Sequence, residues 1–176
     1  MSDRADGRIL VACVGNIFAG DDGFGVEAAR ALQAAELPEC VTVTDYGIRG
    51  LDLAYALIDG WRAVILVDAI RRGGDAGDLY LLQADRNGEA GGLLDPHAMD
   101  PSAVFALARS LGEIRAQIFI VGCEPASLGD DLGGSMGLSQ AVAAAIPEAV
   151  EMVRGLSRQL AMGTYAAGAE LNLLTT

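Results

Sequence analysis

Several classes of protein are excluded by what this sequence of 176 residues lacks. Its three cysteines, Cys13, Cys40 and Cys123, are an odd number, without the short spacing of a zinc ribbon or the pairs of a disulfide framework. No stretch reaches the roughly 18 uninterrupted apolar residues of a membrane span, and the polar start MSDRADGR lacks the apolar segment of a signal peptide. We therefore expect a cytoplasmic protein with no membrane insertion.

Positive charge is also scarce. Twelve Lys and Arg residues stand against 24 Asp and Glu residues, which leaves a formal net charge of −12. Such a chain repels nucleic acids and anionic lipid surfaces, so we expect neither as a partner. With only one histidine, the sequence has no H-E-x-x-H zinc motif, and it has no G-x-S-x-G nucleophile turn either.

What the sequence does contain is an alternation of apolar runs that favour strands with segments that favour helices. Strands are predicted for residues 8–14, 41–46, 63–70, 78–85 and 117–122, and helices for about 22–35, 51–59, 101–111 and 138–160. The turn RRGGDAG predicts that the third and fourth strands form an antiparallel hairpin. We therefore predict an α/β fold, a three-layer α/β/α sandwich with a mostly parallel, mixed five-stranded sheet. Residues 1–160 would form one domain, and residues 161–176 a mobile tail.

The stretch GNIFAGDDGFGV, residues 15–26, joins the first strand to the first helix and imitates two nucleotide-binding motifs. Gly15 and Gly20 have the spacing of P-loop glycines, but Asp21 and Asp22 stand where a lysine and a hydroxyl residue should be, so phosphate would be repelled. Residues 23–28 match G-x-G-x-x-A, with Asp45 about 20 residues further on. A dinucleotide-binding oxidoreductase therefore stays open as an alternative.

Three features that could bind a metal fall near the ends of predicted strands: the adjacent pair Asp21 and Asp22, Asp68, and His97. In an open parallel sheet, functional groups gather at the carboxyl ends of the strands, and two carboxylates with one imidazole suit a divalent transition metal. Each residue also has an ordinary structural alternative. Asp21 or Asp22 could cap the following helix, Asp68 could hydrogen-bond to a neighbouring loop, and His97 could be a plain loop or core residue.

Five segments taken in order resemble the hydrogenase maturation endopeptidases over about residues 8–155. They are ILVACVGNIFAGDDGFGV, TDYGIRGLDLAYAL, VILVDAI, DPHAMDPSAVFAL and VGCEPASLGDDLGGSMGLS. The resemblance implies an α/β/α protease that removes the C-terminal extension of a nickel–iron hydrogenase large-subunit precursor. It also implies that the enzyme recognises nickel already placed in that precursor, so nickel is expected as part of the substrate.

The resemblance assigns metal binding and catalysis to Asp22, Asp68 and His97, and supporting roles to Gly15, Asn16 and Asp45. One departure is Cys13, which replaces the first glycine of the family's usual Gly-x-Gly-Asn turn. We expect a monomer whose partner is the precursor. The alternative from another class is a non-catalytic chaperone for nickel or for the large subunit.

Overall fold

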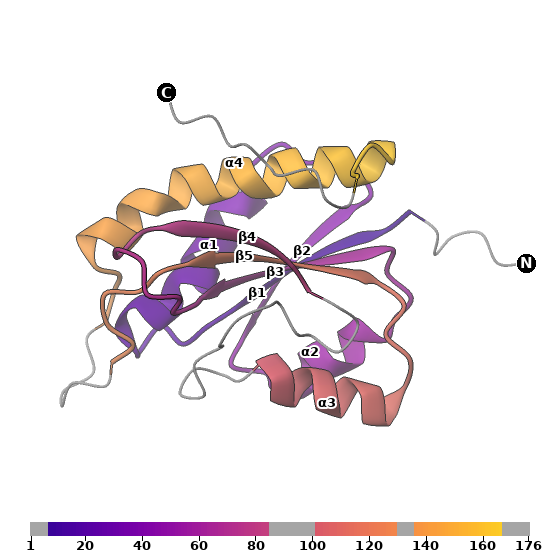
Figure 1. Cartoon of the computed structure of the whole chain (residues 1–176), viewed down its shortest axis with the longest axis horizontal. Coiled ribbons are helices and arrows are strands. Elements are labelled where there is room, and N and C mark those ends of the chain that lie inside the picture. Colours follow the sequence, from indigo (N-terminus) through magenta and orange to yellow (C-terminus); the bar gives the residue numbers. More distant parts are fainter. Residues whose placement is uncertain (1–6, 85–100, 130–135, 167–176) are drawn as a thin grey trace, which may run out of the picture.

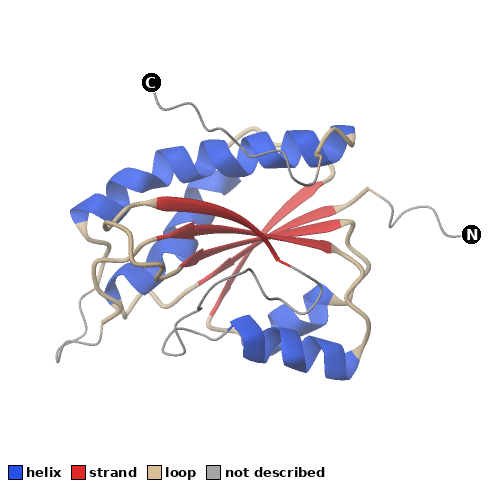
Figure 2. Ribbon diagram, viewed as in Figure 1, coloured by secondary structure: helices blue, strands red, loops and turns tan. Residues whose placement is uncertain are grey.

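The computed structural model describes residues 7–84, 101–129 and 136–166, and its elements follow the predicted alternation (Figures 1 and 2). Their order is β1 (Ile9–Val14), the 3-10 helix η1 (Gly20–Gly23), α1 (Phe24–Gln33), β2 (Val41–Gly47), α2 (Gly50–Leu57), β3 (Ala63–Ala69), β4 (Leu79–Ala84), α3 (Pro101–Leu111), β5 (Gln117–Cys123) and α4 (Gln140–Met162). The α/β fold class predicted from the sequence is confirmed.

The five strands form one mixed sheet in the order β2-β1-β3-β5-β4. Neighbours among β2, β1, β3 and β5 are parallel, and β4 runs antiparallel to β5. The predicted hairpin between the third and fourth strands is wrong, because β5 lies between them. The chain leaves the centre of the sheet after β3, forms the edge strand β4, and returns through α3 to place β5 beside β3.

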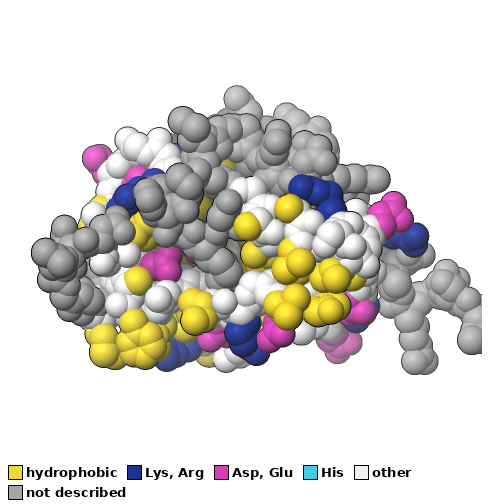
Figure 3. Space-filling model, turned by 90° about the horizontal axis from the view of Figure 1, so that it is seen from below, with side chains coloured by type: hydrophobic (Ala, Val, Ile, Leu, Met, Phe, Trp, Pro, Cys, Tyr) yellow, Lys and Arg dark blue, Asp and Glu magenta, His cyan; other side chains and the backbone are white. Residues whose placement is uncertain are grey.

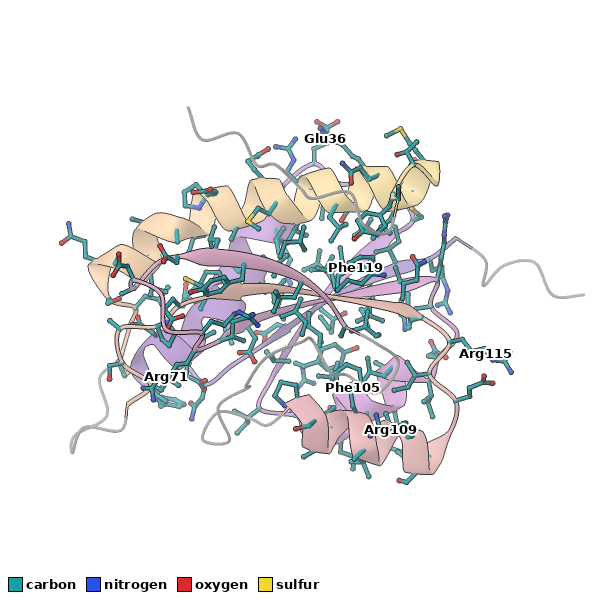
Figure 4. All side chains as sticks on the ribbon, viewed as in Figure 1. Glu36, Arg71, Phe105, Arg109, Arg115 and Phe119 are labelled. Carbon is teal, nitrogen blue, oxygen red and sulfur yellow. The ribbon has the colours of Figure 1, made fainter. Side chains whose placement is uncertain are left out.

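Helices cover both faces of the sheet (Figure 1). One core lies between the sheet and α1 with α4, and the other between the sheet and α2 with α3. Phe119 points from β5 toward α4, and Phe105 points from α3 toward the sheet (Figure 4). The three layers follow from the sequence, because β1 is apolar throughout and β3 is apolar except for Asp68, and such strands can be buried only if both faces are covered.

Helix α1 lies unusually close to the strands below it. A Cβ atom on Gly25 would come within 2.0 Å of the carbonyl oxygen of Val14 and 2.4 Å of that of Val67. Only glycine permits this approach. Gly25, part of the G-x-G-x-x-A match, is therefore explained by helix–sheet packing, which weakens the dinucleotide alternative.

The C-terminal helix extends two residues beyond the predicted domain boundary at residue 160. Ser139 caps its start by accepting a hydrogen bond from the Val142 N–H, and Gly163 ends it in the left-handed conformation. Tyr165 then packs edge-on against Phe119. The rest of the predicted tail, residues 167–176, lies outside the described residues. Within the described ranges, no helix combines the length and the apolar character that a membrane crossing requires.

Candidate active site

The site lies at the edge of the sheet where the parallel strands end. Because β1, β2, β3 and β5 run in the same direction, their carboxyl ends meet at one edge, and register aligns Cys13 with both Asp45 and Val67. The loop after β3 is marked by Arg71, which lies at this edge in Figure 4. This is the place where an open α/β sheet presents its functional groups.

Gly15 and Asn16 hold the turn that carries Asp22. Gly15 has φ +145°, and a Cβ atom there would lie 2.0 Å from the carbonyl oxygen of Asp22. The N–H of Asn16 lies within hydrogen-bonding distance of two Asp22 oxygens, the carbonyl oxygen at 3.1 Å and the carboxylate Oδ2 at 3.0 Å. Both residues thus act through backbone geometry, while the Asn16 side chain accepts a hydrogen bond from the Phe18 N–H. This arrangement is compatible with the supporting roles predicted for them.

The adjacent residues Asp21 and Asp22 have different surroundings. Neither side chain caps the following helix, which was the ordinary structural role considered for them. No side chain caps η1 or α1. Asp21 turns inward, is 2% exposed, and accepts hydrogen bonds from the N–H groups of Ala126 (2.8 Å), Ser127 (3.2 Å) and Ser139 (2.6 Å). Asp21 therefore ties η1 to the loop after β5 and to the start of α4. Nothing in the sequence distinguishes Asp21 from Asp22 in this respect.

Asp68 is a buried carboxylate with little compensation. It is 4% exposed and ends β3 on the face toward α2 and α3. Among the described residues, its carboxylate accepts one hydrogen bond, from the N–H of Ala69 at 2.8 Å. Burial raises the pKa of Asp68 well above its ordinary value, the negative charge of Asp22 raises it further, and the Ala69 hydrogen bond lowers it only in part. The structure therefore brings Asp22 and Asp68 together.

A small cavity adjoins the Asp68 carboxylate. It holds about 20 Å³ and is otherwise apolar. Its lining consists of Val14, Leu53, Leu66, Asp68, Ile70, Pro101, Val104, Phe105 and Ile120. That volume is enough for one water molecule. An acidic group facing an apolar, water-sized space is an arrangement suited to proton transfer.

Asp45 lies on the neighbouring strand β2 and holds the turn at its end. Its carboxylate accepts a hydrogen bond from the Gly47 N–H at 2.8 Å, and the Gly47 carbonyl accepts one from the Gly15 N–H at 3.0 Å. Burial raises the pKa of the Cys13 thiol well above its ordinary value, and the charges of Asp45 and Asp68 raise it further. Cys13 thus lies near both carboxylates as a neutral, buried group.

Glu124 is a further buried carboxylate at this edge, and the sequence analysis missed it. It is 5% exposed and accepts hydrogen bonds from the Arg72 N–H (2.7 Å), the Tyr80 hydroxyl (2.8 Å) and the Gly73 N–H (3.4 Å). Burial acts to raise the pKa of Glu124, but these hydrogen bonds outweigh it, and the net pKa lies below the ordinary value. Glu124 anchors the loop that follows β3. Its signal was available, because it directly follows an apolar strand, as Asp68 ends one.

A larger open hollow lies on the other side of η1. It holds about 310 Å³ between η1, the first turns of α1 and residues 136–138. This last segment belongs to the loop between β5 and α4, and residues 130–135 lie outside the described part of the chain. The hollow borders the turn that carries Asp22.

The third predicted ligand, His97, lies in residues 85–100, outside the described residues. Within the described part of the chain, no group of three His, Cys, Asp or Glu side chains is arranged to hold a metal ion. Asp22 in η1 and Asp68 in β3 carry carboxylate oxygens at the same edge of the sheet. Together with one imidazole they would form a donor set that suits nickel and similar divalent ions.

Comparison with known proteins identifies the family to which the chain is similar. Residues 26–155 match the family model described as hydrogenase maturation protease. The chain is 33% identical to the hydrogenase expression/formation protein HupD of Rhizobium leguminosarum bv. viciae, with 82% of this chain and 71% of HupD covered. It is 30% identical to the hydrogenase 2 maturation protease of Escherichia coli, with 86% and 92% covered.

A solved structure gives the same result for the fold. The hydrogenase maturating endopeptidase HybD from Escherichia coli superposes with a TM-score of 0.72 at 29% identity, covering 86% of this chain and 93% of HybD. Asp68 and His97 fall within the matched family segment, and Asp22 precedes it by four residues. The chain belongs to the hydrogenase maturation protease family.

Proposed function

We propose that this protein is the endopeptidase that removes the C-terminal extension from the large-subunit precursor of a nickel–iron hydrogenase, in the cytoplasm and as a monomer. Family membership supports a protease acting in hydrogenase maturation. The single observation that carries the site assignment is the pairing of Asp22 with Asp68 at the carboxyl edge of the sheet. The sequence resemblance supports the precursor as substrate.

The nickel ion of the precursor is treated as part of the substrate. Asp22, Asp68 and His97 would engage it, and docking would then hold the adjacent peptide bond in one orientation, which contributes much of the rate. The ion would supply Lewis acidity toward the scissile carbonyl or a water molecule. Oxygen and imidazole donors fit hydrolysis by water, and the nearby Cys13 thiol is buried with its pKa raised, so it is a poor nucleophile.

Asp68 is the better candidate for moving the proton. Its raised pKa makes it a stronger proton acceptor than an ordinary aspartate, and the adjoining cavity has room for one water. Asp22, held by the Asn16 N–H, would keep a fixed position and orient the reacting group. In this division both aspartates engage the ion, and Asp68 also exchanges a proton.

The test uses purified protein and a nickel-loaded large-subunit precursor, with release of the C-terminal peptide followed by mass spectrometry. We expect the wild type to shorten the loaded precursor, and Asp22→Asn, Asp68→Asn and His97→Ala to leave it intact. Asp75→Asn, the same substitution in an exposed turn, is the matched control and should retain activity. If two of these three active-site variants still shorten the precursor at the wild-type rate, the proposed site is wrong.

A parallel arm separates the remaining questions. Equal cutting of nickel-free precursor would show that nickel is not recognised, even if the protease assignment holds. A stable complex with the precursor but no shortened product would instead favour the non-catalytic chaperone.

A further inference from the structure

Four large apolar side chains lie exposed beside the candidate active site. They are Phe18 (63% exposed), Ile48 (69%), Leu51 (55%) and Tyr55 (54%). The first lies in the loop after β1, the second in the loop after β2, and the others on α2. A hydrogen bond of 3.0 Å from the Gly15 N–H to the Gly47 carbonyl joins the two loops. We call these four residues the α2 patch.

Helix α2 is apolar on both of its faces. Its inner face buries Leu53, Ala54 and Leu57 against the sheet. Leu51 and Tyr55 are four residues apart and therefore share the outer face. A surface helix normally carries polar side chains outside, and in the sequence GLDLAYAL only Asp52 is charged. Seen from the side of α2 and α3, hydrophobic side chains gather over this face (Figure 3).

The exposed area is larger than scattered surface residues require. Because a large side chain presents about 150–250 Å² when fully exposed, the four together present on the order of 400–500 Å². Contiguous apolar patches of this size on a protein usually serve binding. A stable dimer interface needs about 800 Å² from each partner. The patch by itself is therefore too small to hold a second copy of this chain, and it suits a transient partner.

The charges around the patch indicate what that partner presents. Arg49 and Asp52 form an ion pair of 3.4 Å next to the patch, so the charged groups nearest to it cancel. The chain as a whole carries −12. A basic partner would be attracted to many parts of this acidic protein and not to the α2 patch in particular. A partner with an apolar surface would bind the α2 patch.

The patch is continuous with the candidate active site. Phe18 belongs to the loop in which the Asn16 N–H holds the Asp22 carboxylate, and Ile48 follows the Gly47 carbonyl to which that loop is bonded. A polypeptide that covers Phe18 and Ile48 therefore reaches the turn that carries Asp22.

We propose that the α2 patch is the docking surface for the substrate polypeptide, which contacts it through apolar side chains while the bond to be cut lies at Asp22 and Asp68. This inference rests on the proposed function, because it takes the polypeptide that is cut as the occupant. If the substrate docks away from the bond that is cut, a protease that cleaves one bond can select one protein while recognising few residues at the cleavage site.

The test measures KM and kcat for the nickel-loaded large-subunit precursor. In Leu51→Ser and Tyr55→Ser we expect KM to rise about tenfold, as for a central apolar contact, with kcat within about twofold of wild type. The matched control is Leu111→Ser, the same change at a 40% exposed leucine of α3. It should leave both constants unchanged. Thermal unfolding of each variant shows that these exposed changes leave the fold intact.

A second measurement uses unaltered patch residues. Footprinting of Asp68→Asn mixed with the precursor should show protection of Leu51 and Tyr55 and none of Leu111. Unchanged KM in both patch variants, an equal effect in Leu111→Ser, or a change in kcat alone would overturn the docking surface. Sedimentation that showed a dimer of the wild type, dissociated by Leu51→Ser, would assign the patch to a second copy and overturn it too.

The two hypotheses fail in different ways. If the wild type does not shorten the precursor, the proposed function fails and the docking inference falls with it. If the wild type shortens the precursor and Leu51→Ser matches Leu111→Ser, only the docking surface is wrong.

Discussion

Three buried carboxylates lie at the same edge of this sheet, and they differ in how many hydrogen bonds they accept. Around the end of β5, Asp21 and Glu124 each accept three hydrogen bonds, and these tie loops together. At the end of β3, Asp68 accepts one hydrogen bond within the described part of the chain, from its own neighbour, and faces the charge of Asp22. Burying a charge is costly unless it is compensated. The difference separates carboxylates that stabilise the fold from one whose cost to the fold is consistent with a catalytic use.

The largest expected effect concerns the two aspartates of the candidate active site, Asp22 and Asp68. Asp22→Asn and Asp68→Asn should each lower the rate of precursor processing by about 10²–10⁴-fold, the range for loss of a general acid or base. Because residues that act as one unit are not additive, the double variant should be hardly slower than either single variant. Single-turnover rates measured at saturating precursor test this. If the two losses multiply in the double variant, the aspartates do not act as a unit.

Substitution of Asp21 should lower the stability of the fold, whereas substitution of Asp22 or Asp68 should lower the rate of processing. Asp21→Asn replaces a carboxylate that accepts three N–H groups by an amide whose NH₂ faces some of them, so the free energy of unfolding should fall by about 2–4 kcal/mol. Urea unfolding followed by circular dichroism measures this change. Asp75→Asn, in an exposed turn, is the control and should stay within about 0.5 kcal/mol of wild type. Equal midpoints for the two variants would contradict the structural role of Asp21.

Glu124 adds a test in which pH is varied. Its pKa is lowered in the folded state, so its contribution to stability is present above the unfolded-state pKa of about 4.3 and is lost as the pH falls through the folded-state pKa. Glu124→Gln should therefore cost about 1–3 kcal/mol at pH 7 and progressively less below about pH 4. Glu36→Gln, at an exposed position visible in Figure 4, is the control. A cost that does not change between pH 7 and pH 3 would mean that the ionised form of Glu124 is not what stabilises the loop.

Much of this arrangement could be predicted from the sequence, because it depends on local patterns. Short runs of six to eight residues predicted the strands, and the segment PSAVFALARSL predicted the helix that begins at Pro101. The rule that groups gather at the carboxyl ends of parallel strands pointed to the pair Asp21 and Asp22 and to Asp68, and the family resemblance then selected Asp22. These inferences need only the neighbours of a residue in the chain.

What could not be predicted depends on contacts between distant segments. The partners of Asp21 lie 105 to 118 residues away, and the place of β4 beyond β5 is set by packing on the sheet edge. A sequence in which Asp21 and Asp22 are adjacent and identical cannot show which one turns inward. The exposed outer face of α2 was likewise hidden, because an apolar helix in a sequence looks the same whether its second face is covered or open.

The smallest expected effect is the change in stability caused by Asp68→Asn. It separates Asp68 from Glu124 most clearly, because the two substitutions should change stability in opposite directions. The pKa of Asp68 is raised in the folded state, so the folded protein retains a proton that the unfolded chain releases, and stability falls as the pH rises above the unfolded-state value of about 3.9. Asp68→Asn, which cannot ionise, should therefore be more stable than wild type at pH 7, by about 1–2 kcal/mol. The advantage should disappear below about pH 4. Thermal unfolding in the presence of a chelator measures the difference, and an Asp68→Asn variant that is less stable than wild type at pH 7 would show that the carboxylate is compensated after all and belongs with Asp21 and Glu124.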